Sequence, residues 1–140
     1  EGLEGELKDL IKQQEKEGKK ISENQRSIQR ANDDIATTNG DIQTKAYQIS
    51  DSKRMVDKTA SDENANKGAK KTLKDLENAK KKLQKDNESN SKSIDNWNKD
   101  IRELERSITD LKQQQETKAS DITKQKEKVS EVQNKLGGIN

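Results

Sequence analysis

The side chains that could carry chemistry are carboxylates, amines, hydroxyls and amides, because the 140-residue chain contains no histidine and no cysteine. Paired carboxylates occur at Asp33-Asp34 and at Glu103 and Glu105. An acid–base pair needs a dry, concave site that shifts a pKa, and a chain that is only 24% hydrophobic has little material to build one. Such carboxylates are typical of a solvated helix face. We therefore expect no enzyme activity, no small-molecule substrate, and no catalytic, cofactor-binding or metal-binding residue.

A run of lysines at Lys80–Lys82 and Lys85 could contact phosphate groups. It has no interleaved aromatic side chains, and its field is weakened by the acidic neighbours Asp75, Glu77, Asp86 and Glu88. The formal net charge of the whole chain is only +2. The run therefore indicates another solvated face, and we expect no nucleic-acid partner.

The composition also limits the fold class. Charged residues make up 40% of the chain, aromatic residues 1%, and proline is absent. This is too little apolar material for a compact core, while the absence of proline favours long helices over disorder. No apolar run approaches the roughly 18 residues of a membrane span. The chain begins at Glu1 and its one methionine is Met55, which suggests a fragment or a matured secreted product from which the targeting signal has been removed; no compartment is predicted.

One column of aliphatic residues organises the first half of the chain. Its members recur every seven residues, with Gln14 as the polar exception: Leu7, Ile21, Ile28, Ile35, Ile42, Ile49 and Val56. We call residues 7 to 56 at this spacing the isoleucine column. A strict period of seven is the mark of a coiled-coil seam, so a helix is predicted over residues 3–60. With this column at heptad position d, the companion position a holds Ile11, Gly18, Gln25, Asn32, Asn39, Ala46 and Lys53.

A second helix is predicted over residues 69–136, after a small, polar loop over residues 61–68 that ends at Gly68. Both of its columns are mainly apolar. The predicted core members are Leu73, Leu76, Leu83, Ile94, Trp97, Ile101, Leu104, Ile108, Leu111 and Ile122. Trp97 lies on the apolar column, so we interpret it as a core residue rather than an exposed recognition residue.

The two halves can form either one continuous helix with a stammer or a hairpin in which the loop resets the phase. The hairpin gives matched layers when facing residue numbers add up to 129, because Gln14 then meets Gln115 and Asn39 meets Asn90. Residues 1–64 are acidic and residues 65–140 are basic, which also suits pairing. We predict an all-α fold, an antiparallel two-helix coiled-coil hairpin that forms a single elongated rod over residues 1–140.

In this pairing Val129, Val132 and Leu136 extend beyond the first helix and form a candidate assembly interface. The first functional hypothesis is a structural rod or spacer that self-assembles into a fibre or lattice. The alternatives are a binding module that displays a surface to a protein partner, and an arm of a larger coiled-coil machine. The expected partner is accordingly another protein or a second copy.

The whole-chain character, a charged heptad-repeat polypeptide that begins without methionine, resembles the matured trichocyst matrix proteins of ciliates. The resemblance implies a processed helical chain that packs into crystalline secretory contents. The slightly basic balance of this chain departs from the acidic balance expected of that group.

Overall fold

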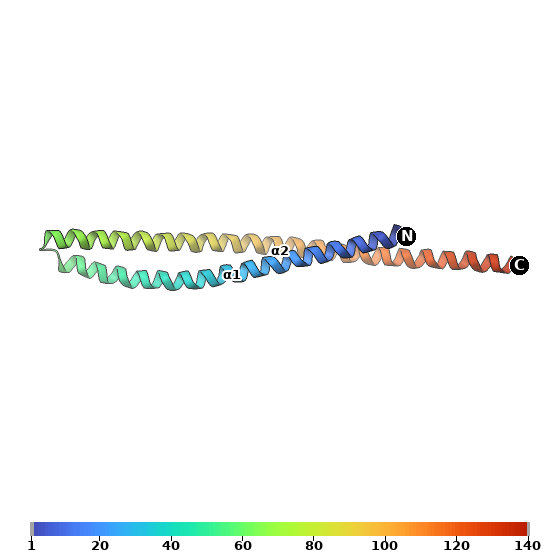
Figure 1. Ribbon diagram of the computed structural model, residues 1–140, viewed down its shortest axis with the longest axis horizontal. Coiled ribbons are helices and arrows are strands. Elements are labelled where there is room, and N and C mark those ends of the chain that lie inside the picture. Colours follow the sequence, from blue (N-terminus) through green and yellow to red (C-terminus); the bar gives the residue numbers. More distant parts are fainter. Residues whose placement is uncertain (1, 140) are drawn as a thin grey trace. The chain divides into compact units, whose positions relative to one another are not determined.

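The computed structural model describes residues 2–139 and consists of two long helices. Helix α1 (Gly2–Lys58) and helix α2 (Glu63–Ile139) run antiparallel and pack against each other (Figure 1). Among the described residues there is no strand. This confirms the predicted all-α, two-helix hairpin and excludes the alternative of one continuous helix.

The helices are joined by a turn at residues 59–62, which is shorter than the predicted loop at 61–68. The Asp62 carboxylate accepts a hydrogen bond from the Ala65 amide at 3.2 Å and so caps the start of α2. The Asn66 side-chain amide donates to the Val56 carbonyl at 2.9 Å and ties the first turn of α2 to the end of α1. Residues 63–68 are therefore helical, and the loop predicted near residues 61–68 lies at residues 59–62.

The contacts divide the chain into two units. Unit 1 takes in the described residues up to Gln25 and from Lys99 onward, and unit 2 is Arg26–Asn98. Each unit pairs part of α1 with part of α2. Unit 2 contains the turn, and unit 1 contains the beginning of α1 and the C-terminal part of α2.

In α1 the whole isoleucine column is at least partly covered, and Ile49 is buried. The second covered column begins with Leu3 and Leu10 and continues as Glu17, Asn24, Ala31, Thr38, Lys45, Ser52 and Thr59. The predicted companion column is therefore wrong by one residue; its Ile11 is 42% exposed, and only Gly18 and Ala46 are partly covered. The covered residue lies three positions after each member of the isoleucine column, and not four. The isoleucine column therefore occupies heptad position a instead of the predicted position d.

In α2 the covered positions follow both predicted columns as far as Ile122. Beyond Ile122 every side chain that the structure describes is exposed, from Thr123 to Gly138. Helix α2 therefore supplies the more apolar side of the seam. The seam ends at Ile122, before the end of α2.

The register differs from the predicted one by about one helical turn. In unit 1 Ser107 bonds Glu17, and their residue numbers add up to 124. In unit 2 Asn66 bonds Thr59, with a total of 125, and Asn87 bonds Asn39, with a total of 126. The predicted total of 129 is wrong for these pairs, and Asn39 meets Asn87 instead of Asn90. The predicted Gln14–Gln115 pair does form, at 2.7 Å, because two long amides can reach along the seam.

Replacing the cap residue should weaken the hairpin measurably. Asp62→Ala removes the acceptor of the Ala65 amide, and we expect the free energy of unfolding to fall by about 1 kcal/mol. Urea denaturation followed by circular dichroism at 222 nm measures the change. Ser61→Ala, an exposed neighbour in the same turn, is the matched control. Equal stability of the two variants would show that the cap does not hold the turn.

Candidate assembly surface

Three apolar side chains near the end of α2 are exposed to solvent. Val129, Val132 and Leu136 are 52%, 56% and 60% exposed, and we call them the C-terminal stripe. Val129 and Leu136 continue at seven-residue intervals the column to which half-buried Ile122 belongs, while Val132 continues the other column. The stripe is therefore the extension of the same helix face that packs against α1 in unit 1.

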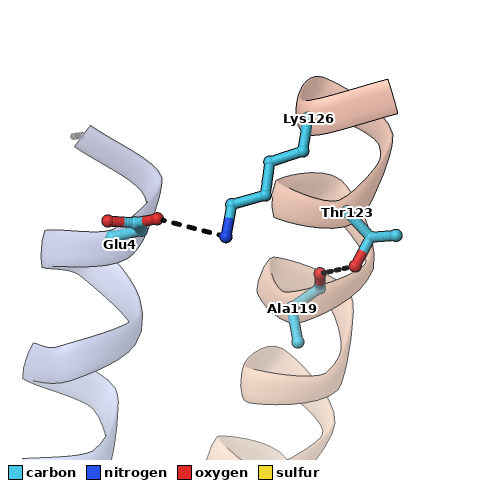
Figure 2. A network of polar contacts seen from close by, with 4 residues as sticks. All are labelled: Glu4, Ala119, Thr123 and Lys126. Atoms are coloured by element: carbon cyan, nitrogen blue, oxygen red, sulfur yellow. Dashed lines mark hydrogen bonds and ion pairs between the residues drawn. The ribbon is translucent and has the colours of Figure 1, made fainter. Parts of the chain in front are cut away.

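Ion pairs mark the point where the seam gives way to the stripe. Lys126 lies 3.8 Å from the Glu4 carboxylate, and Lys118 lies 2.6 Å from that of Glu6. In Figure 2 the Lys126 side chain extends from α2 toward Glu4 on α1, while Thr123 bonds the Ala119 carbonyl of its own helix at 3.1 Å. Exposed pairs of this kind contribute little to stability, so they orient the helix ends more than they hold them.

Glu6 also affects the ionisation of its partner. It raises the pKa of Lys118 above its usual range, first through the hydrogen bond between the two side chains and then through its negative charge. Because the folded pKa is raised, the stabilisation is present while Lys118 is protonated and is lost as the pH rises through that pKa. The pair is therefore intact at neutral pH.

The seam of unit 1 contains polar side chains opposite the apolar face of α2. Gln115 donates to Gln14 at 2.7 Å and to the Leu10 carbonyl at 3.4 Å. Ser107 donates to one carboxylate oxygen of Glu17 at 2.9 Å, while the other oxygen of Glu17 is buried without a hydrogen-bond partner. A buried polar atom without a partner is destabilising. In this unit α1 is thus an imperfect partner for α2.

The structure places the predicted core residues along the seam at different depths. Ile49, Ile101 and Leu111 are buried. The others are half-buried: Leu7, Ile21, Ile28, Ile35, Ile42, Val56, Leu73, Leu76, Leu83, Ile94, Trp97, Leu104, Ile108 and Ile122.

Sequence reasoning missed three small residues that are as buried as the apolar ones. Ala31, Ser52 and Ala69 are 5%, 8% and 9% exposed, and all three belong to unit 2. The available signal was their spacing, since Ala31 and Ser52 are three heptads apart on one column. Small side chains let the two helix backbones approach closely, so these residues mark tight parts of the seam.

The charged groups singled out by the sequence do not come together. Asp33, Asp34, Glu103 and Glu105 are all exposed. In the part of the chain that the structure describes, no group of three or more acidic side chains is arranged to hold a metal ion. Neither helix, over residues 2–139, is apolar enough along its length to cross a membrane.

Comparison with family models, characterised proteins and solved structures finds no match. The function is therefore inferred from the surface of the hairpin itself. The C-terminal stripe is the feature of that surface that most resembles an unfilled helix–helix contact.

The imperfect fit in unit 1 leads to a stability prediction. Glu17→Leu removes the unpaired buried oxygen and adds an apolar side chain to the seam, so we expect the free energy of unfolding to rise by about 1 kcal/mol. Glu15→Leu, an exposed position two residues away, is the control and should leave the stability nearly unchanged. Urea titrations at low protein concentration give both values. A less stable Glu17→Leu variant would contradict this account of the seam.

Proposed function

We propose that this chain is a non-enzymatic structural coiled-coil protein that associates with itself through the C-terminal stripe of α2. The observation that carries the proposal is the continuity of the stripe with the covered columns of the same helix. A heptad pattern of apolar residues that persists beyond the described part of α1 is typical of an intermolecular coiled-coil contact.

The free energy gained by burying the C-terminal stripe supports association. Burying an exposed valine or leucine side chain fully contributes roughly 1.5–3 kcal/mol, and the three stripe residues have more than half of their surface in water. Two copies would bury six such side chains. This gain is of the order needed to oppose the loss of translational and rotational freedom on association, which is at least about 4 kcal/mol.

The polar surroundings of the stripe favour a reversible contact over non-specific aggregation. Lys128, Glu131 and Lys135 lie on the same turns as the apolar residues and are exposed. Charged flanks next to an apolar stripe set partner choice and orientation in coiled coils. A fibre or lattice built from such subunits would be held together by helix pairing rather than by a globular interface.

A charge placed in the stripe should abolish association. The 140-residue chain is expected to show a concentration-dependent rise in sedimentation coefficient, and Val132→Lys should remove it because an ammonium group would be buried at the contact. Ser130→Lys adds the same charge on the same turn but off the stripe, and it should associate like the unaltered chain. A chain that remains monomeric at every concentration would contradict the proposal.

A further inference from the structure

We propose that the partner of the C-terminal stripe is α2 of a second copy, which lies antiparallel along residues 97–136 and displaces the segment of α1 up to Gln25. This inference rests on the proposed self-association and names its surface. The resulting contact is two-fold symmetric, because the same residues of both copies take part.

The apolar columns of α2 can pair with themselves in an antiparallel arrangement. When facing residue numbers add up to 233, each apolar stripe residue meets an apolar residue of the second copy. The layers pair Trp97 with Leu136, Ile101 with Val132, Leu104 with Val129, and Leu111 with Ile122. The central layer, Gln115 with Lys118, is the one layer in which both residues are polar. The layer of Ile108 with Gln125 is mixed. Each layer occurs twice because of the symmetry.

The flanking charges agree with the same register. In an antiparallel pair, positions g face g and positions e face e; this places Asp100 opposite Lys135 and Glu105 opposite Lys126. All four side chains are exposed in the hairpin. The remaining flanking pairs bring no two like charges together: Asn98 with Gln133, Ser107 with Lys128, Lys112 with Ala119, and Gln114 with Asp121.

A shorter pairing, of the two C-terminal ends alone, is less favourable. Placing Val129 opposite Val132 of the second copy brings Lys128 opposite Lys135 twice. Like charges at flanking positions are destabilising. The longer register avoids this repulsion and covers the same stripe, so the charge pattern selects it.

The segment of α1 that must leave has a mixed seam. Its second column is Leu3, Leu10, Glu17 and Asn24, so half of these positions are polar. Glu17 keeps one carboxylate oxygen buried without a partner while it packs there. Exchange removes Glu17 from the seam and pairs Ile101, Ile108 and Ile122 of α2 with Val132, Gln125 and Leu111 of the second copy. The hairpin of unit 2, with its turn and its small buried residues, needs to open only at the layer of Trp97.

Charge reversal tests the register. Asp100→Lys with Glu105→Lys, and separately Lys126→Glu with Lys135→Asp, should each weaken self-association about tenfold, because every flanking attraction becomes a repulsion. An equimolar mixture of the two variants should regain the original affinity as a heterodimer, since all flanking pairs are again opposite in sign. Analytical ultracentrifugation measures each case. Circular dichroism checks that both variants remain helical.

A covalent bridge tests the displacement of α1. The chain has no cysteine of its own, so Gln14→Cys with Gln115→Cys can be joined within one hairpin by a short bismaleimide. The bridged hairpin should remain monomeric at concentrations at which the unbridged double variant dimerises. Equal dimerisation of the two forms would overturn the displacement.

The outcomes separate this inference from the proposed function. If the unaltered chain does not associate at all, self-association itself fails. If it associates but the mixture of charge-reversed variants shows no preference for the heterodimer, the α2–α2 register is wrong while self-association stands. Recovery in the mixture, combined with a monomeric bridged form, supports the inference.

Discussion

The structure depends on an imbalance between the two helices. Helix α2 has two columns that are mostly apolar, whereas α1 has one apolar column and a second of mixed, mainly polar or small residues. A two-helix seam buries apolar surface only where both sides supply it, so the apolar face of α2 is only partly satisfied. The unpaired buried oxygen of Glu17 follows from this imbalance.

The two units respond to the imbalance differently. In unit 2 the second column of α1 contains Ala31 and Ser52, which are small enough to be buried against α2, and Ala69 fills the same role from the other side. In unit 1 the corresponding positions hold Leu3, Leu10, Glu17 and Asn24, and all four are half-buried. Small side chains are thus buried in the part next to the turn, while amide and hydroxyl contacts cross the seam of unit 1.

The sequence was sufficient to predict the fold class, because the isoleucine column repeats without a slip and the phase change near the middle favours a hairpin. It was not sufficient to predict the register, that is, which residues of α1 face which residues of α2. Ile11 and Leu10 are adjacent, and the columns that contain them are similarly poor in apolar residues, so composition cannot decide which one faces α2. The turn was placed too late because Asn64, Asn66 and Gly68 are weak helix formers, and the bonds of Asp62 and Asn66 that keep this segment helical are specific to the folded chain. The exposed stripe could be anticipated, since it needed only the unequal lengths of the two helices.

The four-residue turn has a consequence for how weak a seam the protein can tolerate. By joining the two helices covalently, it holds them at a high effective concentration, in the millimolar range for short linkers. Amide pairs such as Gln14 with Gln115 can therefore occupy seam positions where two separate chains would need leucine or isoleucine. A single backbone cleavage after Lys58, at the edge of that turn, would convert an intramolecular pairing into a bimolecular one that dilution could dissociate.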